Sequence, residues 1–335
     1  MPLPTGDVIG ILADNLRLRK SVLPLSARVA TKWTEGLGLP RGGETVLYTG
    51  MMYQLIPYIE GLVKAEQRLG DSWLAGLTGV GRKVNRLINI SAFMARPSAA
   101  ERARYDQVPI NVAHLLRTAG VGFGALYEDD LYSGALAYDL GADEVVADHA
   151  RRVQAVFKNH GVKNVITIDP HTTTMLRSVY PTLLEGYDVE VRSYLEVLAE
   201  KGLVASGSRG GSTGGSHGNG ANDKLAREVV LHDSCVFARY EGLVDEPREL
   251  LAAAGVTVRD PENARRQTWC CGGPIESLYP AKAAANAAKR VAQLRDVAPD
   301  CVTMCPMCFV NLSTAAGDTM RFTDISQYLR EAYVS

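Results

Sequence analysis

The chain has 335 residues and 36 lysines and arginines against 37 aspartates and glutamates, so its formal net charge is −1. A hydrophobic fraction of 46% with 22% charged residues is typical of a globular protein with room for two domains, and excludes a disordered or fibrous one. This charge balance predicts no nucleic-acid partner. The chain has no apolar run long enough for a membrane span, and its first residues lack the order of an export signal, so we expect a cytoplasmic protein.

The first part of the chain predicts helices followed by an α/β unit. Residues 1–43 are expected to form an N-terminal helical segment, because apolar residues recur there at near-helical spacing. Residues 44–204 are expected to form one domain, with strands at 45–49, 122–127 and 163–168 and helices at 53–69, 139–160 and 193–201. Residues 71–111 are expected to be mostly helical and contain GLTGVGRK, a glycine run without the strand–turn–helix context of a dinucleotide site. We therefore expect no flavin or nicotinamide in this chain.

The remainder of the chain predicts a linker and a second α/β unit. Residues 205–223 are rich in Gly and Ser and are expected to form a flexible linker; the alternative is a loop that covers a site or a partner. Residues 224–335 are expected to form a second domain, with strands at 227–231 and 300–304 and helices at 247–254, 281–295 and 326–333. Strands that alternate with helices predict mostly parallel sheets in both units.

All six cysteines lie in this second unit. Cys235 is followed at a distance by the pair Cys270-Cys271 before Gly272, and then by the motif Cys305-Pro-Met-Cys308. Clustered thiols in a protein without an export signal favour a metal or redox site over disulfides. Five thiols exceed the four ligands of a tetrahedral zinc, which favours an iron–sulfur cluster, with zinc as the alternative. Cys301 lies within a predicted buried strand and is expected to be a core residue.

The chain also contains an internal repeat. LYSGALAYDLGADEVVADHARRVQAVFKNHGVKNVITIDPHTTTML in the first unit corresponds to WCCGGPIESLYPAKAAANAAKRVAQLRDVAPDCVTMCPMCFVNL in the second. The opening strands VLYTGM and VLHDSC correspond as well. The five cysteine positions of the second repeat are therefore occupied in the first by other residue types, namely Met51, Tyr132, Ser133, Asp169 and Thr172. We expect a first repeat that keeps the scaffold and binds no cluster, although Asp169 and His171 are potential ligands for a hard metal or zinc.

The sequences HDSCVFARYEGLVDEPRELLAAAG, WCCGG and MCPMCFVNL resemble the cysteine-rich CCG domain of heterodisulfide reductase-like proteins. The resemblance covers about residues 228–335. It implies an α/β fold of two pseudo-repeated Rossmann-like CCG domains with extra N-terminal helices, the first domain being degenerate. It also implies one noncubane [4Fe-4S] cluster, bound by five ligands: Cys235, Cys270, Cys271, Cys305 and Cys308.

The same resemblance implies an oxidoreductase subunit that is active within a complex. Its cluster would exchange electrons with a disulfide, a thiol or a protein-bound sulfur substrate, which includes sulfur on a lipoate-carrying protein. The expected partners are a ferredoxin-like iron–sulfur subunit and a flavoprotein. His232, Arg239 and Trp269 flank the ligands and are candidates to act beside the cluster, or are simply packed residues. Two alternatives are a scaffold subunit with zinc or an inert cluster, and an iron–sulfur subunit of a 2-hydroxyacid or succinate dehydrogenase.

Overall fold

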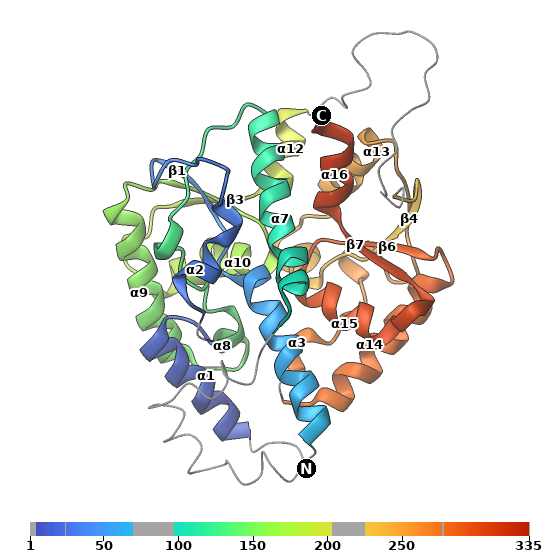
Figure 1. Ribbon diagram of the computed structural model, residues 1–335, viewed down its shortest axis with the longest axis horizontal. Coiled ribbons are helices and arrows are strands. Elements are labelled where there is room, and N and C mark those ends of the chain that lie inside the picture. The colour runs from blue at the N-terminus through green and yellow to red at the C-terminus, as the bar shows by residue number, and fades with distance from the viewer. Residues whose placement is uncertain (1–4, 24, 70–96, 203–224, 277, 335) are drawn as a thin grey trace.

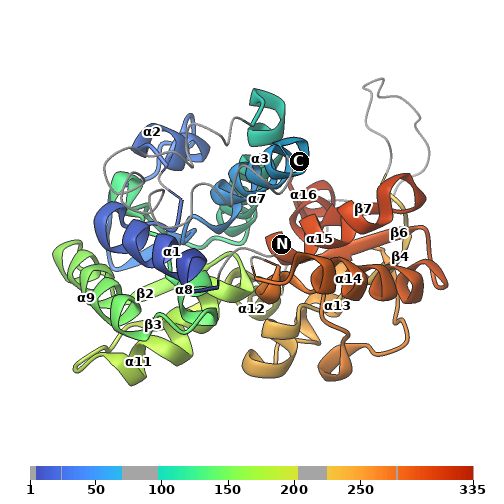
Figure 2. The same ribbon diagram turned by 90° about the horizontal axis from the view of Figure 1, so that it is seen from below.

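The computed structural model describes residues 5–23, 25–69, 97–202, 225–276 and 278–334. The blue-to-yellow first half lies beside the orange-to-red second half (Figures 1 and 2). The predicted linker and the GLTGVGRK run lie outside the described residues, as does most of the predicted helical stretch before residue 97.

Each half contains one parallel sheet. The first sheet has the order β1-β2-β3, and the second has the order β5-β4-β6-β7. Their bounds are β1 (Thr45–Tyr48), β2 (Asn164–Thr167), β3 (Glu190–Ser193), β4 (Glu228–Leu231), β5 (Thr257–Arg259), β6 (Asp300–Thr303) and β7 (Arg321–Asp324). The predicted α/β class with two parallel units is confirmed.

Strand register confirms the internal repeat. Val46 of β1 lies opposite Val165 of β2, and Val230 of β4 lies opposite Cys301 of β6. Val46 corresponds to Val230 when VLYTGM is aligned with VLHDSC, and Val165 corresponds to Cys301 in the longer repeat segments. The two strand pairs are therefore equivalent. In both halves a third parallel strand pairs with the second strand of this pair, β3 with β2 and β7 with β6, and leads into a helix, so the halves share this arrangement.

The helices of the first half surround its sheet. They are α1 (Thr5–Arg19), α2 (Ala27–Ala30), α3 (Met52–Leu69), α7 (Ala99–Thr118), α8 (Ala135–Asp139), α9 (Asp143–Asn159), α10 (Pro170–Thr174), α11 (Tyr180–Leu183) and α12 (Tyr194–Lys201). Short turns of helix occur at η1 (Lys32–Thr34), η2 (Tyr127–Asp129) and the π-helical η3 (Met175–Val179). The predicted N-terminal helical segment is present as α1, α2 and η1.

The helices of the second half follow the predicted pattern closely. They are α13 (Glu246–Ala253), α14 (Pro280–Arg295), α15 (Pro306–Ala316) and α16 (Ile325–Tyr333). The shorter turns are the π-helical η5 (Phe237–Glu241) and the 3₁₀ turns η6 (Arg265–Gln267), η7 (Gly273–Ile275) and η8 (Gly317–Thr319).

Two predictions for the first half are wrong in detail. Residues 122–127 form no strand; Gly124 and Ala125 make isolated bridges with Val46 and Arg41, and η2 begins at Tyr127. The predicted helix 139–160 is broken between α8 and α9, where Gly141 has a φ of 77° that a continuing helix excludes. The strands β3, β5 and β7 were not predicted, because each mixes polar with apolar side chains and has no apolar run.

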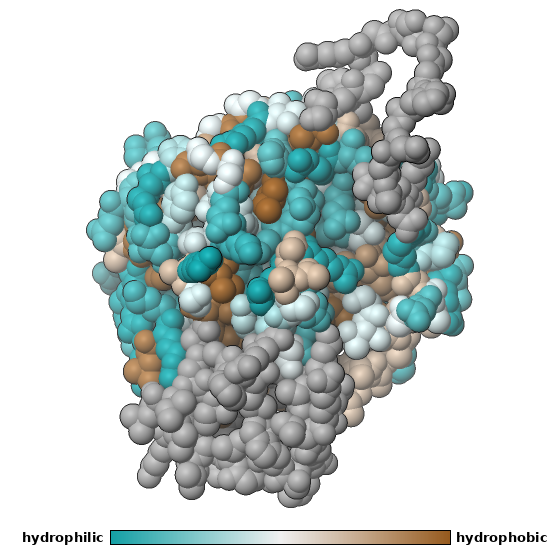
Figure 3. Space-filling model, viewed as in Figure 1, coloured by the Kyte–Doolittle hydropathy of each residue, from teal (hydrophilic) through white to brown (hydrophobic). Residues whose placement is uncertain are grey.

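A shared core joins the two halves. One buried cluster contains Tyr53, Val112 and Leu195 of the first half together with Phe237 and Leu329 of the second. α7 packs along α16, and the two lie side by side in Figure 1. The Tyr53 hydroxyl donates to Asp324 over 2.7 Å across this boundary, so the sheets are held in a fixed relation. No described helix is apolar over a length that would cross a bilayer, and the coloured residues of the face in Figure 3 are mainly hydrophilic.

Candidate functional site

Three segments of the second half bring five cysteines together. Cys235 lies just beyond β4, and Cys305 and Cys308 lie at the start of α15, just beyond β6. Because β4 and β6 are adjacent and parallel, their carboxyl ends meet at one edge of the sheet, which is where α/β proteins place their sites. The loop with Cys270 and Cys271 supplies the third segment. The predicted convergence of these segments is therefore present.

The adjacent cysteines depend on a sharp turn. Gly272 has a φ of 88°, and a Cβ at this residue would lie 2.8 Å from the carbonyl oxygen of Ala283 in α14. The amide of Gly272 donates to the Cys270 sulfur over 3.3 Å. The next residues begin η7, with Pro274 in its first turn. The turn expected from the glycines and proline is confirmed, and only glycine fits at its centre.

The five thiols form a run of sulfur contacts. Cys235 Sγ lies 3.9 Å from Cys270 Sγ, and Cys271 interacts with both Cys270 and Cys308. Cys308 in turn interacts with Cys305. Within the described ranges, no three His, Cys, Asp or Glu side chains are arranged to hold a single metal ion. The thiols thus line a shared space without converging on one ion position.

The thiols strongly influence one another's ionisation. Contact with the Cys270 thiolate raises the pKa of Cys235, and the same contacts lower the pKa of Cys270. Hydrogen bonding and burial also raise the pKa of Cys271 and of Cys308. Burial opposes ionisation of Cys305, but its contacts with Cys308 and His171 lower its pKa. Because charge on one thiol suppresses charge on the next, full deprotonation of the five requires positive charge beside them.

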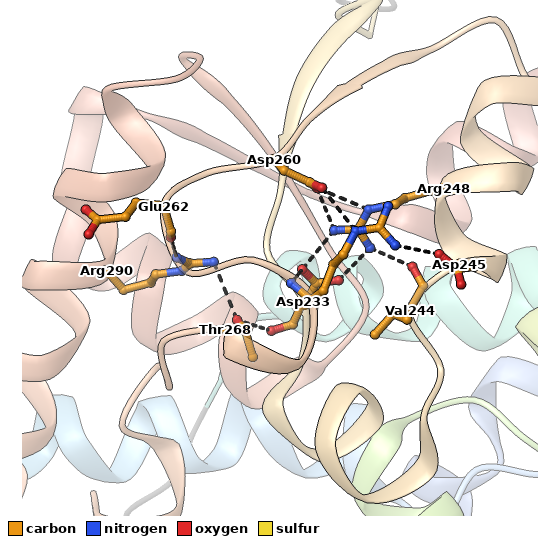
Figure 4. Close-up of polar contacts among 9 residues, drawn as sticks. Asp233, Val244, Asp245, Arg248, Asp260, Glu262, Thr268 and Arg290 are labelled. Atoms are coloured by element: carbon orange, nitrogen blue, oxygen red, sulfur yellow. Dashed lines mark hydrogen bonds and ion pairs between the residues drawn. The ribbon is translucent and has the colours of Figure 1, made fainter.

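A network of ion pairs fixes the loops that carry the thiols (Figure 4). Asp233, two residues before Cys235, accepts from the guanidinium of Arg248 at 2.7 and 2.9 Å and from the amide of Arg265 at 2.7 Å. The Thr268 hydroxyl donates to the carbonyl of Asp233 over 2.9 Å. The β4 loop and the Cys270 loop are therefore tied together, and the side chain of Asp233 is buried.

His232 has one ring nitrogen without a partner. Its Nδ1 accepts from Arg290 Nε over 3.1 Å, and burial together with the Arg290 charge lowers its pKa to about 3. The ring is thus neutral, with its proton on Nε2. That buried N–H finds no hydrogen-bond acceptor in the described part of the chain, and neither do the hydroxyls of Ser234 and Thr303 at the same sheet edge. A bound group whose sulfur atoms accept hydrogen bonds would provide partners for these unused donors beside the five thiols.

The other two candidate residues lie at the surface of the site. Arg239 donates to the carbonyls of Arg266 and Thr268, so it braces the loop that precedes Cys270. Trp269 is 37% exposed, and its indole N–H donates to Asn286, whose amide donates to the carbonyl of Cys270. Cys301 is fully buried in β6, and burial raises the pKa of its thiol, as the core prediction requires.

The first repeat has no thiol at the five equivalent positions. Met51 and Tyr132 are buried, and the Tyr132 hydroxyl accepts from the amide of Leu136. Asp169 caps α10 by accepting from the amide of Thr172, whereas Cys305 precedes α15 without such a bond. A Cβ at Gly50 would lie 2.3 Å from Thr172 Oγ1, so the loops have closed on each other there.

The first repeat nevertheless contributes one residue to the thiol site. His171 is buried; burial opposes its protonation, but hydrogen bonding to the Cys305 thiolate outweighs this and raises its pKa to about 9. Its Nδ1 also lies 3.9 Å from a carboxylate oxygen of Asp139. The sequence indicated His171 only as a potential metal ligand within its own repeat. His171 aligns with Met307, and Met307 packs against the core of the first half. This alignment was the signal that His171 also faces the opposite half.

Comparisons with known proteins agree with this geometry. Residues 229–313 match the family model described as CCG, cysteine-rich domain. The second repeat is a CCG domain. It contains Cys235, Cys270, Cys271, Cys305 and Cys308, so the expected family resemblance is confirmed.

Matches to three curated relatives cover more of the chain than the CCG domain does. The chain is 35% identical over 169 residues to an EtfAB:quinone oxidoreductase of Syntrophomonas wolfei, which covers 50% of this chain and 22% of that protein. It is 29% identical over 238 residues to the probable iron–sulfur-binding oxidoreductase FadF of Bacillus subtilis, with 68% and 32% covered. It is 27% identical over 229 residues to a component of the dihydromethanophenazine:CoB–CoM heterodisulfide reductase of Methanosarcina mazei, with 63% and 51% covered.

These matches show that the chain is similar to heterodisulfide reductase-like proteins and to other oxidoreductases, and that its second repeat matches their cysteine-rich domain. The chain spans between about a fifth and a half of the length of these relatives. Among solved structures, an aspartate racemase homologue from Pyrococcus horikoshii aligns at 10% identity with a TM-score of 0.27, which is too low to define a shared fold.

Proposed function

We propose that the CCG domain binds one noncubane [4Fe-4S] cluster through Cys235, Cys270, Cys271, Cys305 and Cys308. The observation that carries this proposal is the assembly of five thiols in a run of sulfur contacts beside the unpartnered N–H of His232. Iron and sulfide satisfy both features, because the metal stabilises thiolates and the sulfides accept hydrogen bonds. The relatives named as iron–sulfur and heterodisulfide reductase proteins support the same assignment.

When bound, the cluster supplies one-electron transfer to or from sulfur. The chain's own residues provide the environment. His232, held in one tautomer by Arg290, would have its unpartnered Nε2 proton available for a sulfur of the bound cluster. Cys271, Cys305 and Cys308 are buried and keep water from that side of the site.

His171 provides a second polar contact from outside the CCG domain. Its hydrogen bond reaches the Cys305 thiolate, so a residue of the degenerate repeat acts on a ligand of the other repeat. The carboxylate of Asp139 lies 3.9 Å from Nδ1 of the same ring and, like Cys305, favours its charged form. On this proposal the first repeat is retained because it completes the wall of the site.

The proposed role is that of a redox subunit in a heterodisulfide reductase-like complex. The substrate is a disulfide, a thiol or a protein-bound sulfur, such as sulfur on a lipoate-carrying protein. Reduction of one disulfide consumes two electrons and two protons and yields two thiols, whereas a single cluster passes one electron at a time. The chain therefore requires partner centres, and a ferredoxin-like iron–sulfur subunit and a flavoprotein fit that need.

Metal analysis of the anaerobically purified chain tests the proposal. We expect about four irons and four acid-labile sulfides per chain, together with a paramagnetic signal in one oxidation state. The signal should change when oxidised lipoamide is added as the disulfide probe and should not change with S,S′-dimethylated dihydrolipoamide, which has no disulfide to reduce. One zinc per chain without iron would instead indicate a scaffold subunit and refute the proposal.

A further inference from the structure

Exposed apolar side chains gather around one edge of the thiol site. Cys235 and Cys270 are half-buried, whereas the other three ligands of the proposed cluster are buried. In the described part of the chain, most of the large apolar side chains that are exposed flank these ligand segments, namely Tyr240, Trp269, Ile275 and Tyr279. Only Leu18 and Tyr138, among those described, lie elsewhere. The site thus approaches the surface at Cys235 and Cys270.

Contacts show that these side chains belong to one surface. Arg239, beside Tyr240, donates to the carbonyls of Arg266 and Thr268, which brings η5 against the loop of Trp269. Trp269 then contacts Asn286 of α14 through its indole N–H, over 2.9 Å. Tyr279 precedes the first turn of α14, and Lys282 lies over its ring at 5.0 Å. The surface runs from η5 across the Cys270 loop to α14.

The same surface is positively charged. Arg239, Arg266, Lys282 and Lys289 are exposed, and α14 places Lys282, Asn286 and Lys289 on one face by their spacing of four and three residues. Among the described residues, no carboxylate forms an ion pair with these four cations. Of the carboxylates in the neighbouring loops, Asp245 and Asp260 are engaged by Arg248 and Arg265, and the four cations outnumber the exposed Glu262. The positive charge is therefore local, in a chain whose net charge is −1.

We propose that this surface docks an acidic electron-carrier protein over Cys235 and Cys270. We call it the basic rim and define it by Arg239, Tyr240, Arg266, Trp269, Tyr279 and Lys282. Aromatic and arginine side chains are enriched at protein interfaces, and uncompensated cations select a partner of negative charge. The identity of the partner as a redox protein rests on the proposed function, because the rim frames the only half-buried thiols among the proposed ligands.

Binding to an acidic redox protein tests the rim directly. The probe is a plant-type [2Fe–2S] ferredoxin of strongly negative net charge, titrated calorimetrically into the full chain under anaerobic conditions at low salt. The rim variant carries Arg266→Glu and Lys282→Glu. A matched control carries Lys158→Glu and Lys201→Glu, which make the same charge change on exposed residues of the first repeat.

We expect the rim variant to weaken binding by about tenfold or more, and the control by less than about twofold. The difference should shrink above about 0.5 M salt, because screening shortens the range of charge attraction. Tyr240→Ala should weaken binding by a factor that salt leaves unchanged, since Tyr240 is 72% exposed and contributes apolar contact. Equal weakening in the rim variant and the control, or none in either, would overturn the proposal.

Electron-transfer kinetics supply a second test that separates the rim from the cluster. The reduced chain is mixed rapidly with hexacyanoferrate(III), an anion, or with hexaammineruthenium(III), a cation. Charge reversal at the rim should slow oxidation by the anion and accelerate oxidation by the cation, with neither effect in the control. Identical effects on both oxidants would contradict docking at this edge. A chain without iron would refute the proposed function, and the ferredoxin titration would still decide the docking proposal.

Discussion

Gly134 in the first repeat and Gly272 in the second have nearly the same backbone angles, with φ of 87° and 88°. Asp169 and Cys305 each precede a proline that begins a helix, and both have a φ of −136°. The loops that hold five thiols in one repeat therefore have close backbone counterparts in the repeat without thiols. This similarity indicates that strands, glycine and proline determine the loop shapes, and that the ligands are added to a scaffold that folds without them.

The threonine and the aspartate that connect two of these loops exchange places between the repeats. In the first, the Thr49 amide and hydroxyl both donate to the carboxylate of Asp130. In the second repeat the two residue types have exchanged loops. Asp233 follows β4, and Thr268 of the other loop donates its hydroxyl to the carbonyl of Asp233. The exchange leaves the carboxylate of Asp233 free to bind Arg248. Each repeat thus ties the same two loops together by a different bond.

The largest expected difference between the repeats is in metal content. Cys271→Ser should abolish or convert the cluster and lower the stability of the CCG domain, because metal binding is coupled to folding. Ser133→Ala, at the equivalent position of the first repeat, should leave iron and sulfide unchanged. Iron analysis and thermal unfolding of both variants check this. Cys301→Ala is a further control, and unchanged iron in Cys271→Ser would refute the ligand assignment.

The equivalent glycines should differ in their tolerance of alanine. Gly134→Ala introduces only an unfavourable positive φ, which costs about 1 kcal/mol, because its nearest neighbours lie 3.8 Å from the added Cβ. Gly272→Ala adds a contact of 2.8 Å with the backbone of α14 and should cost about 3 kcal/mol or more. Urea unfolding measures both values. Equal losses would mean that the Cys270 loop does not pack on α14 as described.

The exchanged threonines provide a smaller difference. At pH 8 we expect Thr49→Val to cost about 2 kcal/mol, because it removes a donor to a carboxylate, and Thr268→Val about 1 kcal/mol. Burial raises the pKa of Asp130 to about 7, so at pH 5.5 its carboxyl is protonated and the cost of Thr49→Val should fall. Urea unfolding at both pH values tests this. A cost of Thr49→Val that does not change with pH would contradict the buried carboxylate.

A further expected effect is on the reduction potential. His232→Leu removes a proposed N–H donor to the cluster and should lower its potential by roughly 60 mV, which corresponds to about 1.4 kcal/mol for one electron. Iron content should stay the same. His149→Leu is the matched control, because His149 is buried in the first repeat, with Nε2 bound to the carbonyl of Tyr132. Equal potentials in the two variants would assign His232 to packing alone.

Much of the architecture was predictable from local patterns. The strands with β-branched cores, β1, β2, β4 and β6, and the longer helices α14 and α16 follow from apolar runs and periodicity. The five cysteines of the CCG domain and the glycine after them were identifiable because few residue types serve as metal ligands or adopt a positive φ. The short edge strands and the break at Gly141 were not, because their local sequence favours no single structure.

The sequence by itself determined the repeat, the α/β class and the set of thiols, since each depends on residue type and spacing along the chain. Only the tertiary structure decided which groups surround those thiols. His171 reaches Cys305 from the opposite repeat, Arg290 fixes the proton of His232, and Arg239 binds the carbonyl of Arg266. These contacts join residues far apart in the chain, and the packing of two sheets through one core brings them together.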